Sequence, residues 1–200
     1  MIINHAATGV RQGGPIRFWR RWVFAGVFLI LGVMLLALAW VDPLARMGIF
    51  YNETASEPVG FYRMDKLGRL HDGEIIRFCP DPSLPIMALA KRHGWLAPGP
   101  CPGDLAPFLK TIVATQGQEV SLTAKGLCVN GKCLPHSAPK ARSWTGKTPL
   151  PHYHFGHYRV QRGGVWVYGT LSSWSLDSRY YGPVPTHRLL SSARPMLTFR

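Results

Sequence analysis

Acidic residues are scarce in this sequence: 10 Asp and Glu stand against 23 Lys and Arg, for a formal net charge of +13. Charged residues of both signs make up only 16% of the chain, whereas 21 Gly and 17 Pro interrupt it repeatedly, which favours a strand-rich, loop-rich body over a helix bundle. The basic residues form no run of five or more and accompany no motif that reads a nucleic-acid groove. A basic face directed at anionic lipid headgroups explains the charge equally well.

Charge is missing altogether from one segment near the N-terminus. Residues 22–41 are twenty consecutive residues without a charged side chain, and a helix of that length spans about 30 Å, the thickness of a bilayer core. Four arginines precede this run, so we expect residues 1–21 to stay in the cytoplasm, residues 22–41 to anchor the chain in the inner membrane, and residues 42–200 to form a periplasmic domain. The alternative is a cleavable signal peptide, since residues 37–39 are a small-x-small site, but the apolar run is longer than the usual signal core.

Cysteine is rare, with four in the chain. Cys128 and Cys133 flank an Asn-Gly turn, which indicates a two-residue hairpin in which the two cysteines face each other with Cα atoms about 4.5 Å apart. In an oxidising compartment such a pair can form a disulfide, and Cys79 and Cys101 could form a second. A four-cysteine zinc site is the weaker alternative. Such sites usually contain a pair of cysteines separated by about two to four residues, whereas Cys79 and Cys101 are 22 residues apart.

Short runs of β-branched and aromatic residues, separated by turn signals, recur after residue 50. They favour a mainly β, antiparallel fold of barrel or sandwich type. The expected strands lie in residues 73–79, 108–115, 158–160 and 165–169, with a meander over 117–134 and a short helix within 84–93.

Lys110 lies in the middle of an apolar strand sequence, Phe-Leu-Lys-Thr-Ile-Val. A lysine can act as a general base for a serine nucleophile only if burial lowers its pKa, because a solvated ammonium keeps its proton at neutral pH. The other interpretation is an edge-strand lysine that blocks aggregation.

Two further segments carry polar side chains that could belong to a site with Lys110. Ser56 follows the apolar run closely and stands in a Thr-Ala-Ser-Glu-Pro-Val-Gly sequence, which by itself also fits a plain turn. Residues 169–185 begin at a glycine where a strand should end, and they carry Ser, Asp and Arg in a tight loop.

The three segments in this order resemble the type I signal peptidase family. Residues 175–185 (SLDSRYYGPVP) fit its last sequence box closely, whereas the box around Lys110 fits loosely, and the resemblance covers most of residues 50–186. Two departures stand out: Glu57 replaces the methionine that follows the nucleophile, and Gly169 is followed by Thr-Leu where the family has Asp-Asn. The pattern around Ser56 is similar to the TraF-type branch, the peptidases of conjugative plasmid transfer.

The resemblance implies the same antiparallel β fold and assigns roles without any cofactor or metal. The implied roles are Ser56 as nucleophile, Lys110 as general base, the Ser56 N–H and the Thr54 hydroxyl as oxyanion donors, Ser175 as the group that orients Lys110, and Asp177 and Arg179 as supports of their loop. Residues 152–157 contain three histidines, and we interpret this segment as a surface loop. The competing interpretation is a zinc site on His152 and His154 with a third ligand, but no carboxylate lies nearby in sequence.

From the resemblance we expect a membrane-anchored serine endopeptidase that processes a pre-protein, with a conjugative pilin precursor as substrate and ring closure of the product as a variant of the reaction. Inner-membrane lipids and the conjugative transfer machinery are the expected partners, and nucleic acid is not, since the domain should be exported. The alternatives are a general signal peptidase and a non-catalytic assembly subunit of a conjugative secretion channel.

Overall fold

The computed structural model describes residues 15–199, and for residues 15–21, 37–43 and 45 it describes the backbone alone. The first fourteen residues of the predicted cytoplasmic segment therefore lie outside the described residues. The chain divides into two compact units, Met1–Met47 and Gly48–Arg200.

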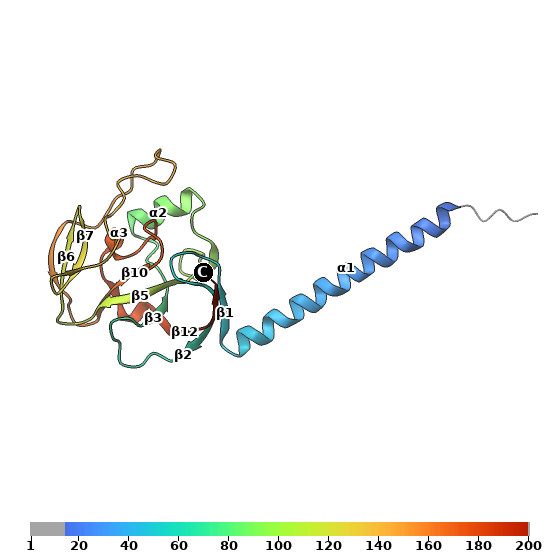
Figure 1. The fold of residues 1–200 in the computed structure, drawn as a ribbon, viewed down its shortest axis with the longest axis horizontal. Helices are drawn as coiled ribbons and strands as arrows, with labels where there is room; N and C mark the ends of the chain where they lie inside the picture. Colours follow the sequence, from blue (N-terminus) through green and yellow to red (C-terminus); the bar gives the residue numbers. More distant parts are fainter. Residues whose placement is uncertain (1–14, 200) are drawn as a thin grey trace, which may run out of the picture. The chain divides into compact units, whose positions relative to one another are not determined.

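The first unit contains one long helix, α1 (Pro15–Arg46), of 32 residues (Figure 1). It includes the whole of residues 22–41, and its apolar side chains are largely exposed, for example Phe28 at 71% and Leu29 at 69%. Among the described residues, no helix combines the length and the apolar character that a membrane crossing requires. The transmembrane role of residues 22–41 stays a prediction.

The second unit is built around a seven-stranded antiparallel sheet (Figure 1). In spatial order its strands are β1 (Ile49–Asn52), β2 (Val59–Asp65), β12 (Leu189–Phe199), β3 (Ile75–Phe78), β5 (Phe108–Ala114), β10 (Gly164–Tyr168) and β11 (Val184–Pro185). The strand that carries Lys110 is thus an inner strand, because β5 pairs with β3 on one side and with β10 on the other. The interpretation of Lys110 as an edge-strand lysine is wrong.

A smaller four-stranded sheet packs beside the large one. Its spatial order is β8 (Lys132–Cys133), β7 (Gly126–Val129), β6 (Glu119–Thr123) and β9 (Gly156–Arg159). The first three strands confirm the meander predicted over residues 117–134. Both sheets are antiparallel, so the mainly β class is confirmed.

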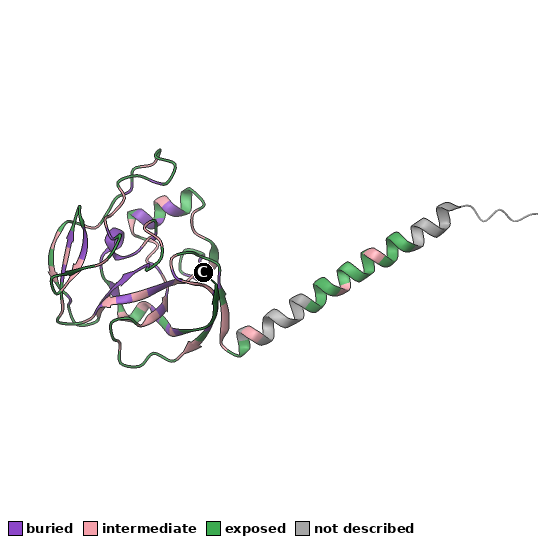
Figure 2. Ribbon diagram, in the orientation of Figure 1, coloured by how far each residue is buried: buried purple, intermediate pink, exposed green. Residues whose placement is uncertain are grey.

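Buried residues gather on the inner strands of the large sheet and on two short helices (Figure 2). The remaining elements are α2 (Pro85–Arg92), β4 (Pro98–Cys101), α3 (Ser178–Tyr181) and the 3-10 helix η1 (Thr186–Arg188). Ile76, Ile112 and Val167 from three adjacent strands pack with Met87 of α2 and Tyr181 of α3 in one hydrophobic cluster. The centre of the sheet is therefore apolar, and β5, the strand that carries Lys110, contributes to it.

The four cysteines form two disulfides. Cys79 pairs with Cys101 with Cα atoms 5.4 Å apart, and Cys128 pairs with Cys133 with Cα atoms 3.8 Å apart. The facing of Cys128 and Cys133 across the Asn-Gly turn is as predicted, although their backbones are closer than the expected distance of about 4.5 Å. Because all four sulfurs are paired, the zinc alternative for the cysteines is wrong.

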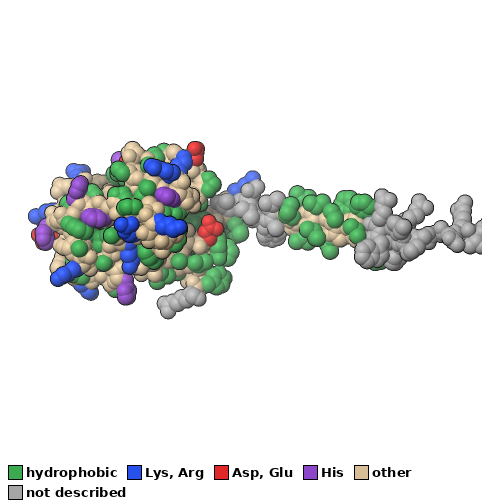
Figure 3. Space-filling view, turned by 90° about the horizontal axis from the view of Figure 1, so that it is seen from above, with side chains coloured by type: hydrophobic (Ala, Val, Ile, Leu, Met, Phe, Trp, Pro, Cys, Tyr) green, Lys and Arg blue, Asp and Glu red, His purple; other side chains and the backbone are tan. Residues whose placement is uncertain are grey.

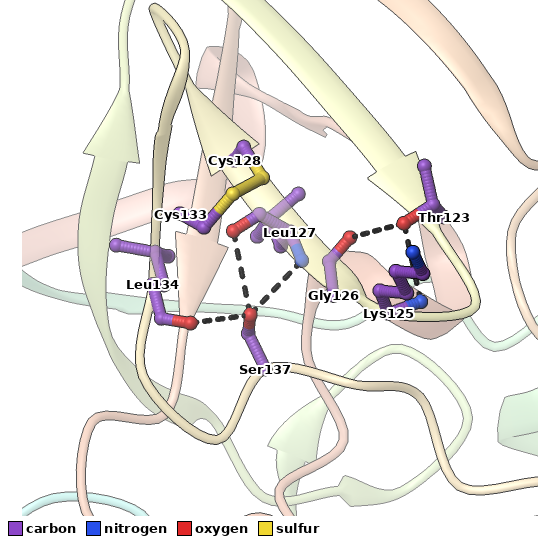
Figure 4. The surroundings of a disulfide bond; sticks show 8 residues. All are labelled: Thr123, Lys125, Gly126, Leu127, Cys128, Cys133, Leu134 and Ser137. Carbon is purple, nitrogen blue, oxygen red and sulfur yellow. Dashed lines mark hydrogen bonds between the residues drawn. A yellow bond between two sulfur atoms is a disulfide. The ribbon is translucent and has the colours of Figure 1, made fainter.

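Ser137 closes the base of this disulfide hairpin (Figure 4). Its hydroxyl accepts a hydrogen bond of 2.9 Å from the N–H of Leu127 and donates one of 2.7 Å to the carbonyl of Leu134. The long loop after the hairpin is thereby fixed to the small sheet.

Candidate active site

Ser56 lies on the loop between β1 and β2, and the side chain of Asn52 shapes this loop. Asn52 is 6% exposed, and its Nδ2 donates to the carbonyls of Thr54, Glu57 and Pro58 at 2.9, 3.2 and 3.1 Å. Its Oδ1 accepts from the N–H and the hydroxyl of Thr54 at 3.2 and 2.8 Å. One buried amide therefore satisfies backbone groups on both sides of Ser56 and defines the conformation of the loop.

Lys110 is only 5% exposed on the inner strand β5. Burial lowers its pKa from 10.5 to about 8, against the charges of Asp177 and Glu57, which raise it, while Arg179 lowers it further. Its Nζ lies 5.4 Å from the centre of the Phe108 ring, and none of the described carboxylates forms an ion pair with it. The side chain thus has the desolvated environment that a lysine needs in order to act as a base at neutral pH.

Ser56 and Lys110 line the same cavity, which has a volume of about 470 Å³. Thr54 and Ser175 also line it, so four of the six predicted site residues meet there. The rest of the lining is mainly apolar and includes Phe50, Leu96, Phe108, Trp144, Leu150, Trp174 and Leu176. A cavity with apolar walls and a few polar groups at one place is typical of a substrate site.

Gly169 is the point at which the loop after β10 meets the loop of Ser56. A Cβ atom on Gly169 would overlap the side chain of Ser175 and lie 3.3 Å from the Cβ of Ser56. Two residues further along, the N–H of Leu171 donates to the carbonyl of Ser56 at 3.2 Å. A residue without a side chain is therefore required for the two loops to approach each other so closely.

Asp177 and Arg179 do not line the cavity but hold the loop behind it. Both side chains are 0% exposed, and they form a two-pronged ion pair with N–O distances of 2.8 and 2.9 Å. Asp177 also accepts from the N–H of Gly169 at 3.0 Å, and Arg179 donates to the carbonyl of Ser175 at 3.0 Å. Burial alone would lower the pKa of Arg179, but the hydrogen bonds and charge of Asp177 raise it. The pair thereby joins Gly169, directly after β10, to Ser175.

Three of the predicted contacts are absent from this conformation, and the first is the hydrogen bond between the hydroxyl of Ser56 and the amine of Lys110, which is not formed among the described residues. The hydroxyl of Ser175, which is 3% exposed, has no hydrogen-bond partner among the described residues, so the expected bond between Ser175 and Lys110 is not formed. The hydroxyl of Thr54 donates to Asn52 rather than pointing freely into the cavity. Thr54 and Ser175 nevertheless line the cavity, and a hydroxyl group can rotate at little cost in energy.

Sequence reasoning missed two residues of this site, Asn52 and Glu57. Glu57 is 1% exposed although it follows Ser56 directly in a loop, where a carboxylate normally faces water. An acid beside a candidate nucleophile in an acid-poor chain was the available signal. For Asn52 the signal was its position at the end of a strand, where an Asn side chain commonly bonds the backbone of the following turn.

The histidine-rich loop shows no metal site. His152 contacts the carbonyl of Tyr153 at 2.7 Å and stacks on Phe155 with ring centres 4.2 Å apart. In the part of the chain that the structure describes, no three His, Cys, Asp or Glu side chains are grouped so that they could hold a metal ion. The zinc interpretation of His152 and His154 therefore lacks a third ligand among these residues.

Comparison with known proteins identifies the family of the chain. Residues 19–197 match the family described as "Signal peptidase, peptidase S26". The plasmid transfer protein TraF of Escherichia coli is 37% identical over 152 residues, covering 76% of this chain and 84% of that protein. The conjugal transfer protein TraF of Agrobacterium tumefaciens (strain 15955) is 37% identical over 159 residues, with the same two shares covered. A solved signal peptidase I from Enterococcus faecalis V583 is 18% identical and covers 64% of this chain and 98% of its own, with a TM-score of 0.36. This chain therefore belongs to the signal peptidase family, peptidase S26.

Proposed function

We propose that this protein is a membrane-anchored serine endopeptidase that uses Ser56 as nucleophile and Lys110 as general base to process a pre-protein. The observation that carries the proposal is a lysine that is 5% exposed on an inner strand and lines the same cavity as the serine. With a pKa of about 8, such a lysine is unprotonated in about one molecule in ten at pH 7. That fraction is sufficient for general-base catalysis, which is most efficient when the pKa of the base lies near the working pH.

The reaction begins when neutral Lys110 takes the hydroxyl proton of Ser56 and the oxygen attacks the scissile carbonyl. Negative charge then develops on the carbonyl oxygen, for which the N–H of Ser56 and the hydroxyl of Thr54 are the nearby donors. Thr54 must first turn away from Asn52, to which it donates at 2.8 Å. Protonated Lys110 next gives its proton to the leaving amine, and water attacks the acyl-enzyme to release the second product.

Conjugative transfer is the proposed setting. The support is that curated relatives with 37% identity are named as plasmid or conjugal transfer proteins. The resemblance of the Ser56 segment to the TraF-type branch makes a pilin precursor the proposed substrate, with small residues before the cut. In ring closure, an amine of the same peptide would attack the acyl-enzyme in place of water.

The proposed location is the periplasmic face of the inner membrane. Residues 22–41 lack charge, and the described apolar side chains of α1 are exposed, which suits contact with lipid. On the face seen in Figure 3, blue Lys and Arg side chains are more numerous than red Asp and Glu side chains, and the whole chain has a net charge of +13. Such a surface is attracted to anionic headgroups and would keep the site near a membrane-tethered substrate.

The test is to express the full chain with a candidate pilin precursor and to weigh the product by mass spectrometry. Ser56→Ala and Lys110→Met should each reduce processing by roughly 10³-fold or more, because each removes a group on which the covalent step depends. Ser83→Ala and Lys125→Met are matched controls at exposed positions and should process normally. A product lighter than the linear fragment by one water would demonstrate ring closure.

Retained processing by Ser56→Ala would contradict the proposal and favour the non-catalytic assembly subunit. Rescue of a strain depleted of its own housekeeping signal peptidase would instead favour general signal-peptide removal. The two results separate the rivals, since the first concerns the chemistry and the second concerns only the substrate.

A further inference from the structure

Glu57 is a buried carboxylate whose hydrogen bonds all come from other segments of the site. One carboxylate oxygen accepts from the N–H and the hydroxyl of Thr111, both at 2.9 Å. The other oxygen accepts from the hydroxyl of Thr170 at 2.8 Å. The side chain is 1% exposed, so these three donors replace the water that a carboxylate would otherwise bind.

Each residue in this cluster is a direct chain neighbour of a residue described above: Ser56 and Lys110 line the cavity, and Gly169 packs against Ser56. Glu57 follows Ser56, Thr111 follows Lys110 on β5, and Thr170 follows Gly169 at the end of β10. The partners lie 54 and 113 residues away from Glu57 in sequence. A single carboxylate therefore joins the three segments that meet at the cavity.

The negative charge of Glu57 also acts on Lys110. The charged groups that face Lys110 are Asp177 and Glu57, which raise its pKa, and Arg179, which lowers it. Burial raises the pKa of Glu57 itself, while hydrogen bonds from Thr170 and Thr111 and the charge of Lys110 lower it.

Tyr62 is the other titratable group beside Glu57. Its pKa is raised to about 12, first by burial and then by the charge of Glu57, and its hydroxyl donates to Pro58 at 2.7 Å. Tyr62 thus stays neutral in the working range and adds no charge next to the carboxylate.

We propose that Glu57 is a positioning residue for the Ser56–Lys110 pair: its carboxylate joins the loop of the serine to the strand of the lysine, and its charge acts on the lysine. This inference rests on the proposed function, because it gives Glu57 a role only relative to that pair. The carboxylate has two roles that substitutions can separate. Its hydrogen bonds to Thr111 and Thr170 hold the loop of Ser56 in place, and its negative charge favours the protonated form of Lys110.

Glu57→Gln removes the charge and keeps the shape. The amide oxygen can still accept from both donors of Thr111, and the amide nitrogen can donate to the hydroxyl of Thr170. Glu57→Asp does the opposite: it keeps the charge but is one methylene too short to reach both threonines. The matched control is Glu119→Gln, which removes the same charge from an exposed position on the small sheet.

The first measurement is the titration of Lys110 in the full chain in detergent micelles, followed by NMR of ¹³C-labelled lysine Cε and assigned with Lys110→Met. In the wild type we expect a pKa near 8. Glu57→Gln should lower it by about one unit, because a nearby negative charge has been removed. Glu57→Asp and Glu119→Gln should leave it within a few tenths of a unit of the wild type.

The second measurement is the pH profile of kcat/KM for processing. Only neutral Lys110 can accept the serine proton, so the rise in rate with pH should move to lower pH in Glu57→Gln by the same amount as the titration. Glu57→Asp should keep the midpoint of the wild type but lose at least tenfold in kcat, because Ser56 is no longer held against β5. A purely structural role for Glu57 would change the height of the profile without moving it.

An unchanged Lys110 titration in Glu57→Gln would overturn this inference, even if Ser56→Ala abolishes processing as the proposed function requires. Conversely, a shifted titration together with full processing by Ser56→Ala would leave the inference about the charge intact and refute the proposed peptidase. If Glu57→Gln does not fold, Thr170→Val removes one of the three donors instead. It should reduce processing, and Thr170→Ser, which keeps the hydroxyl, should restore it.

Discussion

Arg179 and Lys110 are two buried cations on segments that meet at one site, but their surroundings shift their pKa values in opposite directions. Arg179 is 0% exposed and bonds Asp177 through two nitrogens, with its guanidinium 4.8 Å from the centre of the Tyr168 ring. Lys110 is 5% exposed and faces the cavity, and among the described carboxylates none is ion-paired with it. One charge is compensated at bonding distance and the other is not.

The difference shows that the pKa of a buried cation depends more on whether a carboxylate is ion-paired with it than on burial. Both side chains lose water, which lowers the pKa of each. For Arg179 the hydrogen bonds and charge of Asp177 reverse that change, whereas for Lys110 it persists and leaves a pKa of about 8. A compensated cation stabilises the loop that bears it, and an uncompensated one is available to bind and release a proton.

The largest expected effect comes from breaking the compensated pair. Asp177→Asn leaves Arg179 charged and buried without a counter-ion, so the free energy of unfolding should fall by about 3–5 kcal/mol. The replacement also weakens the acceptor for the N–H of Gly169. Urea unfolding of the full chain in micelles, followed by tryptophan fluorescence, measures the loss. A change below about 1 kcal/mol would mean that the pair contributes little to the stability of the loop.

The second effect should have the opposite sign. Lys110→Met replaces an uncompensated buried charge with an apolar side chain, so at pH 7 it should raise the free energy of unfolding by about 3 kcal/mol, the equivalent of the pKa shift. The pKa of Lys110 is about 8 in the folded chain against an ordinary value of 10.5. The unfolded chain therefore binds more protons between these values, and the wild type gains stability as the pH rises through this window.

The advantage of Lys110→Met over the wild type should accordingly shrink between pH 7 and pH 10, as measured by urea unfolding at both ends. Lys125→Met, at an exposed position, is the control and should show no such pH dependence. A loss of stability in Lys110→Met at pH 7 would show that the lysine is compensated after all. The comparison with Arg179 would then fail.

The residues that sequence pattern identified are those whose signal is local. The Asn-Gly turn fixes the register that brings Cys128 opposite Cys133, and the apolar neighbours of Lys110 indicate a strand, although they do not distinguish an inner strand from an edge strand. Strand β12 was missed because its sequence mixes Ser, Arg and Pro, and its partner β2 lies more than a hundred residues earlier in the chain. Pairing over such a separation leaves no local pattern to read.

Glu57 shows the same limit within the site. On its own segment it looks like a solvent-exposed loop acid, and only the folded chain brings Thr111 and Thr170 to it. The resemblance to a family drew attention to the position as a departure from pattern, yet gave no reason for it. The burial of a polar group depends on partners from elsewhere in the chain, so the sequence could mark the position of Glu57 as unusual but could not show that its side chain is buried.

The smallest expected effect concerns an ion pair outside the buried region, and it tests whether burial is what gives the Asp177 pair its strength. Asp65 bonds Arg194 at 2.6 Å, at least as short as the distances in the buried pair, but the arginine side chain is 69% exposed. Asp65→Asn should therefore cost no more than about 1 kcal/mol, and that cost should nearly vanish in 1 M NaCl because salt screens exposed charges. The loss in Asp177→Asn should persist at the same salt concentration. Equal losses for the two variants, or equal sensitivity to salt, would show that distance alone sets the strength of these pairs, and the contrast between compensated and uncompensated buried charge would lose its physical basis.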